Sequence, residues 1–238
     1  MVDLHTHILP NIDDGAQSVE ESLLLIQSLL NQSISKVVCT PHFNPTQLSL
    51  EDFVKRRDQS MSLLKEANIT LIPGSETILH EYLFHYPDLN GLCIGNTRYL
   101  LTELPYCKWN DKTYELLERF ISYYNICPLI AHIERYTSVK KSSKSIKRLI
   151  DLGCVIQVNS SSITEENNLG LIVRYMKQGF IDVIASDCHN MTVRPPTLDQ
   201  AFSIIGRKFG LEYCELLKRN AQSIVDGVML REKENYII

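Results

Sequence analysis

Short, uninterrupted apolar segments recur along this chain of 238 residues, and most of them end close to a histidine or an acidic residue. Continuous apolar segments indicate strands buried on both faces, as in a parallel sheet covered by helices. Longer amphipathic segments lie between them. The expected strands are residues 2–5, 36–40, 69–74, 98–103, 127–131, 154–158 and 181–185. This alternation predicts an α/β fold with parallel strands.

The segments between the strands carry helix start and stop signals. Ser18 begins a capping-box pattern, and Gly153, Gly179 and Gly210 each follow an amphipathic segment that they would end. The expected helices are the segment after Ser18 and residues 50–66, 112–124, 143–152, 165–178 and 197–209. Seven strand–helix units favour a barrel smaller than the eight-stranded type, with an open doubly wound sheet as the alternative. No G-x-G-x-x-G follows an expected strand, which disfavours a Rossmann fold.

Bulk composition limits the class of protein. A hydrophobic content of 44% at this length fits one globular domain, residues 1–238. A net charge of -4 without a basic stripe disfavours nucleic acid as a partner. Seven scattered cysteines without a CxxC pair favour a reducing compartment. Neither a leader segment nor an apolar run of about 18 residues is present, so we expect a cytoplasmic protein without membrane insertion.

The first expected strand carries two histidines. His5 and His7 are two positions apart and therefore face the same side of the strand. They are either metal ligands or polar residues at a strand end. The loop that follows contains Asp13, Asp14 and Gly15, which are typical of an Asx turn. One of these carboxylates could bind a metal while the other orients the turn.

Further candidate ligands follow the ends of later strands. They are His42, Glu76, Glu103, His132, Asp187 and His189. Because the carboxyl ends of barrel strands meet at one face, these side chains would converge there. Imidazole and carboxylate groups bind Zn, Mn and Fe. The pattern therefore predicts a polynuclear metal site. The alternative is that histidines and acidic residues follow so many strand ends by chance. The sixth strand end carries Gln157 and Asn159, which are weaker ligands.

Two arginines lie just beyond ligand-bearing strand ends. Arg135 follows His132, and Arg194 follows His189 in a loop stiffened by Pro195 and Pro196. The planar guanidinium group suits bidentate binding of phosphate, and metals and arginines together stabilise phosphoryl transfer. The sequence lacks a G-x-S-x-G elbow, a P-loop and a cysteine phosphatase loop. Metal-assisted phosphate chemistry is therefore favoured.

Taken together, these motifs resemble a known family. The chain resembles the PHP-domain metallophosphatases (polymerase and histidinol phosphatase superfamily), and more narrowly the bacterial manganese-dependent tyrosine-protein phosphatases of capsule and exopolysaccharide loci. The matching stretches, in chain order, are Asp3-Leu-His-Thr-His7, Asp13-Asp-Gly15, Thr40-Pro-His42, Gly74-Ser-Glu76, Thr102-Glu103, Ile130-Ala-His-Ile-Glu-Arg-Tyr136, Gln157-Val-Asn-Ser160, Ala185-Ser-Asp-Cys-His-Asn190 and Arg194-Pro-Pro196. They run from the first residues to about position 200.

The resemblance implies a distorted (β/α)7 TIM-like barrel, the PHP fold, with three manganese ions; Fe, Co or Zn would also suit the ligands. The implied first ion is held by His5, His7, Glu76 and Asp187. Glu76 bridges to the second, which Glu103 and His132 also bind, and the third is held by Asp14, His42 and His189. The residues expected to act in catalysis are Arg135, Arg194 and His42, and both arginines match the family's phosphate-contacting positions.

The implied activity is hydrolysis of phosphotyrosine on a bacterial tyrosine autokinase that regulates capsular or exopolysaccharide synthesis. We expect a monomer or weak oligomer. One alternative is a PHP phosphoesterase that acts on a small phosphomonoester such as histidinol phosphate, or a nuclease. Another is a non-catalytic metal-binding PHP module, although such modules often lose ligands and here the expected set is complete. Residues 77–95 match no motif of the family and leave substrate preference open.

Overall fold

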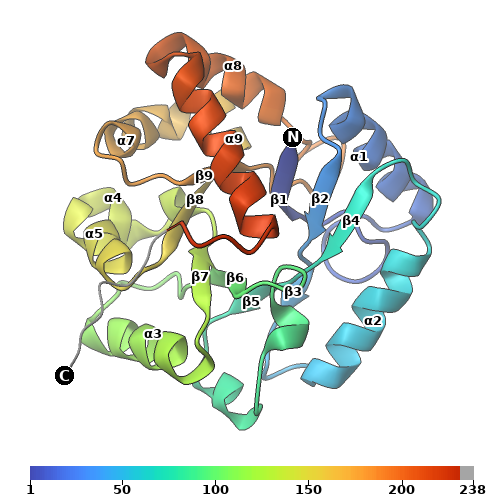
Figure 1. The fold of residues 1–238 in the computed structure, drawn as a ribbon, viewed down its shortest axis with the longest axis horizontal. Helices are drawn as coiled ribbons and strands as arrows, with labels where there is room; N and C mark the ends of the chain where they lie inside the picture. Colours follow the sequence, from blue (N-terminus) through green and yellow to red (C-terminus); the bar gives the residue numbers. More distant parts are fainter. Residues whose placement is uncertain (231–238) are drawn as a thin grey trace.

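The computed structural model describes residues 1–230, with the backbone alone described at residues 141, 166 and 167. Parallel strands lie at its centre and helices surround them (Figure 1). The strands are β1 (Val2–Thr6), β2 (Lys36–Cys39), β3 (His42–Phe43), β4 (Thr70–Pro73), β5 (Glu76–Ile78), β6 (Tyr99–Glu103), β7 (Cys127–Ile130), β8 (Val155–Asn159) and β9 (Val183–Ala185). Each of the seven expected strands is present within a few residues of its predicted bounds.

The helices follow the strands in the expected alternation. The α-helices are α1 (Val19–Asn31), α2 (Leu50–Ser62), α3 (Asp111–Tyr124), α4 (Thr137–Lys141), α5 (Ser143–Asp151), α6 (Ser160–Thr164), α7 (Glu166–Lys177), α8 (Leu198–Phe209) and α9 (Leu211–Val225). Short 3₁₀ helices are η1 (Glu81–His85), η2 (Asn90–Leu92) and η3 (Ile133–Arg135). Ser18 caps α1 as predicted, because its hydroxyl accepts a hydrogen bond from the Glu21 N–H at 3.2 Å.

The strands form two parallel sheets, in the orders β1-β2-β4 and β3-β5-β6-β7-β8-β9. Strands β3 and β5 continue β2 and β4 after breaks at Pro41 and Gly74, so seven strand positions remain. The two sheets meet between β1 and β9, where His7 N donates to Cys188 O at 2.9 Å and Asp187 N donates to His5 O at 2.8 Å. The predicted α/β barrel-like sheet is confirmed, and the open doubly wound sheet is wrong.

Two hydrophobic cores stabilise this arrangement. The larger core lies between the sheets and the surrounding helices and includes Phe53 and Phe120. The smaller core fills the barrel interior, where Leu4 and Leu129 pack with Ala221 and Ile224 of α9. Helix α9 lies across the end of the barrel in Figure 1 and closes it. The opposite end, where the strands have their carboxyl ends, is called the mouth below.

Helix α9 follows Gly210, in a segment for which no element was predicted from the sequence. Helix α9 buries Cys214, Leu217, Ala221 and Ile224, which recur at helical spacing. The helix expected over residues 50–66 also ends earlier, at Ser62. The segment from Arg231 to Ile238, whose sequence suggests a polar end with a loose apolar tip, lies outside the described residues. Within residues 1–230, no helix is both long enough and apolar enough to cross a membrane.

Candidate metal centre

Four buried side chains meet at the centre of the mouth. The Nε2 atoms of His5 and His7, both carried by or next to β1, lie 3.1 Å apart. Glu76 Oε2 lies 3.2 Å from each of these nitrogens. Asp187 Oδ1 lies 3.2 Å from His5 Nε2 and 3.5 Å from His7 Nε2. One ligand atom from each residue therefore lies within 4.8 Å of every other, which is a spacing that could hold a metal ion.

A second group opens toward solvent. It contains His7, Asp14, His42 and His189, again with one ligand atom each within 4.8 Å of the others. Asp14 Oδ1 lies 3.3 Å from His42 Nε2 and 3.4 Å from His189 Nε2. The side chain of Asp14 is 63% exposed and that of His42 is 36% exposed, whereas His189 is buried. This part of the centre is accessible from solvent.

Glu76 links the first group to a third. His42, Glu76 and Glu103 place ligand atoms within 4.8 Å of one another. His132 Nε2 lies 2.7 Å from Glu76 Oε1 and 3.6 Å from Glu103 Oε1. The structure thus brings together every candidate ligand of the sequence analysis, and the two oxygens of Glu76 face different groups. His42 also lies 3.1 Å from Glu76 Oε2, so it is near more than one group.

Backbone conformation helps to aim two of these side chains. His132 has a φ of 32° and Asp187 a φ of 55°, both in the left-handed region that residues other than glycine rarely adopt. Residues held in such conformations cluster at functional sites, because the surrounding structure must stabilise them. Here Gln157 Oε1 accepts a hydrogen bond from His132 N at 2.7 Å. Asp187 N bonds to His5 O across the strands.

Asp13 orients the histidines instead of joining a ligand group. Its Oδ2 atom lies 2.7 Å from His7 Nδ1 and accepts a hydrogen bond from His42 N at 3.1 Å. Its Oδ1 atom accepts one from Gly15 N at 2.9 Å. A carboxylate on the far ring nitrogen fixes the tautomer and leaves His7 Nε2 free to bind a metal. The sequence left open which of the two aspartates orients the turn, and the structure assigns that role to Asp13.

Polar residues of β8 support the centre from below. Asn159 Nδ2 donates to Asp187 Oδ2 at 2.6 Å, and Gln157 Nε2 donates to Asn159 Oδ1 at 2.7 Å. Gln157 Oε1 also lies 3.3 Å from His5 Nδ1. From the sequence, Gln157 and Asn159 were expected to be weaker ligands. They form instead a hydrogen-bonded row that holds His5 and Asp187 in place.

Both predicted arginines reach the centre. Arg135 Nη2 and Arg194 Nη2 each lie 2.6 Å from Asp187 Oδ2. Their side chains remain 33% and 30% exposed. Arg194 Nη1 also lies 3.8 Å from Asp14 Oδ2. Two guanidinium groups therefore border the solvent-facing side of the ligand cluster, where they could bind an anion.

The charges of the centre favour a cation. Burial opposes ionisation of Glu76, yet His5 and His132 hold the pKa of its carboxyl well below the usual range. Burial lowers the pKa of His7, but its bonds to Asp13 and Glu76 outweigh this and raise it to about 10. Glu76 and His7 are thus each stabilised in the charged form by groups of opposite charge beside them. Burial and the neighbouring His7 lower the pKa of His189 to about 3, so this imidazole is in the neutral form that binds metals.

Unpaired buried atoms also fit a bound metal. Asp187 Oδ1 and His189 Nε2 are buried and have no hydrogen-bond partner among the described residues. Such atoms are rare in proteins unless an ion or water satisfies them. Both belong to the ligand groups described above. Mixed imidazole and carboxylate donors suit Mn, Fe, Co and Zn, so the residues present fit a metal centre of this kind.

Tyr106 lies at the mouth but was not predicted from the sequence to belong to the site. The Tyr106 hydroxyl donates a hydrogen bond to Glu103 Oε1 at 2.8 Å, and its ring lies 6.2 Å from that of His132. Burial and the charge of Glu103 raise the pKa of Tyr106 far above its ordinary value. The only sequence signal is its position three residues after a candidate ligand, in the loop that leaves β6.

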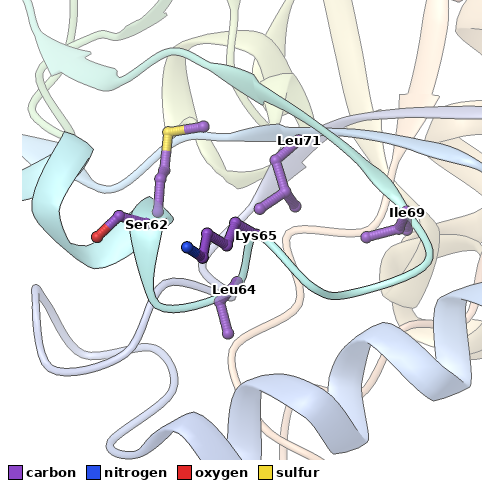
Figure 2. A pocket seen from close by; sticks show the side chains of 6 residues that line it. Ser62, Leu64, Lys65, Ile69 and Leu71 are labelled. Atoms are coloured by element: carbon purple, nitrogen blue, oxygen red, sulfur yellow. The ribbon is translucent and has the colours of Figure 1, made fainter.

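A separate hollow lies between the end of α2 and β4 (Figure 2). Its lining residues are Met61, Ser62, Leu64, Lys65, Ile69 and Leu71. None of them is a candidate ligand, and most are apolar. This hollow therefore has no part in the metal centre.

Replacing Asp13 by asparagine should weaken metal binding about 10- to 100-fold, as expected for loss of a carboxylate that orients a ligating histidine. The isosteric amide keeps the turn but removes the charge that favours the required tautomer of His7. Isothermal titration calorimetry of metal-stripped protein with Mn²⁺ would measure the change in affinity. An affinity equal to that of the wild type would show that Asp13 does not orient His7.

Replacing Gly15 by alanine should destabilise the loop that carries Asp13 and Asp14, by about 1–3 kcal/mol for an overpacked site. A Cβ at this position would lie 2.1 Å from the carbonyl oxygen of His7, so the backbone has to move. Gly170 in α7 is the matched control, because a Cβ there meets nothing within 4 Å. Gly170→Ala should stabilise the helix slightly. Urea unfolding of both variants tests this, and equal stabilities would contradict it.

The fold and this centre together define an α/β barrel protein with a candidate polynuclear metal site at the carboxyl ends of its strands. The chain belongs to the capsular polysaccharide synthesis family CpsB/CapC, whose sequence model matches residues 1–226.

Curated relatives have similar lengths. The chain is 31% identical over 243 residues to "Tyrosine-protein phosphatase CpsB" of Streptococcus agalactiae serotype III (strain NEM316), covering 94% of this chain and 98% of the relative. It is 27% identical over 233 residues to "Tyrosine-protein phosphatase YwqE" of Bacillus subtilis (strain 168), covering 94% and 91%.

Solved structures support the same fold. One solved chain superposes on this protein with a TM-score of 0.85 at 24% identity, and the match covers 98% of both chains. It comes from a study of YwqE from Bacillus subtilis and CpsB from Streptococcus pneumoniae, which are described as "unique metal-dependent tyrosine phosphatases". The phosphotriesterase homology protein from Escherichia coli, complexed with phosphate in its active site, has a TM-score of 0.58 at 11% identity, covering 93% and 97%. These two likenesses concern the fold.

Proposed function

We propose that this chain is a manganese-dependent tyrosine-protein phosphatase that acts in capsular or exopolysaccharide synthesis. The observation that carries the proposal is the meeting of the histidine and carboxylate clusters with two arginines at Asp187. Membership of the CpsB/CapC family, whose curated relatives are named tyrosine-protein phosphatases, supports the activity. Manganese is the metal that the resemblance favours, and the donor set is compatible with it.

We propose three ions, with ligand sets close to the three groups of side chains, except that His132 joins Glu76 and Glu103 in place of His42 and that His7 serves the first ion alone. His5, His7, Glu76 and Asp187 would hold one; Glu76, Glu103 and His132 a second; and Asp14, His42 and His189 a third. Bound divalent cations lower the pKa of water and withdraw charge from phosphoryl oxygens. Glu76 fits the bridging position because its two oxygens face different groups.

The arginines would bind the phosphoryl oxygens. Arg135 and Arg194 border the ligand cluster, and their contacts with Asp187 fix where their guanidinium groups lie. Paired guanidinium groups stabilise the charge that spreads over the equatorial oxygens during transfer. The exposed part of the centre, at His42 and Asp14, gives the substrate access to these groups.

Cysteine chemistry is a poor alternative. Cys188 lies between two candidate ligands, but it is completely buried, and burial raises the pKa of its thiol far above the usual range. A thiol that stays protonated and cannot reach the substrate is not a nucleophile. Its place is that of a small packed residue. Direct attack of water on phosphorus therefore accounts best for the site.

The substrate that we propose is a bacterial tyrosine autokinase with phosphotyrosines on an extended tail. An accessible mouth suits a segment of chain better than a folded surface. We also propose a cytoplasmic location and a monomer or weak oligomer, made of a single domain over residues 1–238. Burial of six of the seven free cysteines is compatible with a reducing compartment.

Phosphate release from a phosphotyrosyl peptide, a phosphoseryl peptide and histidinol phosphate tests the activity. Metal-stripped protein would be assayed with and without Mn²⁺. We expect release from the phosphotyrosyl peptide, and only after manganese is added. Release mainly from histidinol phosphate would favour a small-molecule phosphoesterase, and no release by metal-loaded protein would favour a non-catalytic module.

A further inference from the structure

Tyr106 has one packed side and one open side. Its ring lies nearly parallel to that of His132, with 6.2 Å between the centroids and 18° between the planes, and 5.4 Å from the ring of Tyr136. The hydroxyl is fixed by its hydrogen bond to Glu103 Oε1 at 2.8 Å. Despite these contacts, Tyr106 is 51% exposed. The aromatic ring is thus held in one place at the mouth while much of its surface faces solvent.

Few large hydrophobic side chains are exposed so near the centre. Among the described residues, only Tyr106, Met191 and Val193 are exposed and lie within three positions of a candidate ligand or of the two arginines. Met191 and Val193 precede Arg194 in the loop after β9. Tyr106 is the aromatic one of the three, and its loop leaves β6 directly after Glu103. Exposed apolar groups at a polar site often serve to bind a ligand.

We propose that Tyr106 determines specificity by stacking on the phenyl ring of phosphotyrosine, so that the site prefers aryl to alkyl phosphate monoesters. This inference rests on the phosphatase function proposed above. A phosphoryl group bound between the ligand cluster and the arginines would leave the ring of its ester at the mouth, beside Tyr106. Phosphoserine has a shorter side chain without a ring, so it could not stack on Tyr106.

The expected size of the effect follows from aromatic pairing. Offset or edge-to-face rings with centroids about 4.5–7 Å apart contribute beyond the area they bury, up to a factor of about ten in affinity. Tyr106 already makes such contacts with His132 and Tyr136. Because the contacts with these two rings hold the Tyr106 ring in advance, little conformational entropy is lost when a substrate ring stacks on it.

The test compares the ratio of kcat/KM for phenyl phosphate to that for an alkyl phosphate in manganese-loaded protein. Tyr106→Ala should lower this ratio about tenfold, mainly through KM for phenyl phosphate, because only the aryl ester loses a contact. Tyr106→Phe should keep the ratio, since it retains the ring and removes only the hydroxyl. Tyr123→Ala is the control: Tyr123 is 61% exposed in the last turn of α3, away from the mouth. It should not change the ratio.

A binding measurement separates stacking from effects on turnover. Tyr106→Ala should weaken binding of benzylphosphonate about tenfold by calorimetry and change that of methylphosphonate much less, with metal content equal to that of the wild type. An unchanged ratio in Tyr106→Ala would overturn the inference while leaving the phosphatase intact. An equal fall in Tyr106→Phe would overturn it too, because the hydroxyl would then carry the preference. A wild-type protein inactive on both esters would overturn the proposed function together with the inference.

Discussion

Replacing Asp187 by asparagine is expected to lower turnover on a phosphotyrosyl peptide by at least about a thousandfold, because the charge of this side chain serves both the metals and the arginines. Its Oδ1 atom faces His5 and His7, and its Oδ2 atom contacts Arg135 and Arg194. The amide cannot neutralise a cation and turns an N–H group toward neighbouring donors. Bound manganese should fall together with turnover.

Asparagine is the informative substitution at this position. Asp187 has a φ of 55°, a conformation that asparagine tolerates well and alanine does not, so Asp187→Asn tests charge with little backbone strain. The matched control is Asp226→Asn, at the end of α9 and away from the mouth, where the carboxylate accepts hydrogen bonds from Gln222. Turnover of Asp226→Asn should equal that of the wild type. If Asp187→Asn keeps the turnover and the metal content of the wild type, Asp187 is not a metal ligand.

Replacing Arg135 by alanine should lower kcat about 100- to 1000-fold while leaving the metal content close to that of the wild type. Arg135 lies at the edge of the centre, 33% exposed, and contacts Asp187 through Nη2 without being able to bind a cation. Its loss therefore removes an anion-binding group and spares the ligands. Steady-state kinetics and elemental analysis of the same preparation would measure both quantities.

Two further variants sharpen this prediction. Arg135→Lys keeps the charge but loses the planar fork, so it should recover only part of the lost turnover. Arg219→Ala removes an exposed arginine from α9, at the closed end of the barrel, and should have no effect. If Arg135→Ala loses its metal in proportion to its activity, then Arg135 stabilises the ligand cluster and does not act on the phosphoryl group.

Much of this fold could be predicted because its signals are local. Continuous apolar segments located the strands that carry the ligands, and the chain places His5, Glu103 and His132 at or next to strand ends. The barrel fold by itself then brings these strand ends together. The family resemblance and the fold are confirmed by the match over residues 1–226 and by the TM-score of 0.85. The metal identity and the roles of the ligands stay predictions.

Other features depend on contacts that a sequence does not record. Asp13 and Asp14 are adjacent and chemically identical, and only the turn at Gly15 places one against His7 and the other near His189. Tyr106 reaches the mouth through the path of its loop. Helix α9, by contrast, shows a helical spacing of apolar residues from Cys214 to Ile224, so it could have been predicted from the sequence although it was not.

The most direct test of a three-metal centre is a crystal structure of the manganese-loaded protein with phosphate bound, using anomalous scattering to locate the ions. We expect three anomalous peaks: one among His5, His7 and Asp187, one at Glu103 and His132, and one among Asp14, His42 and His189, with Glu76 between the first two and phosphate between the ions and both arginines. Fewer peaks, or ions bound by other residues, would contradict the account.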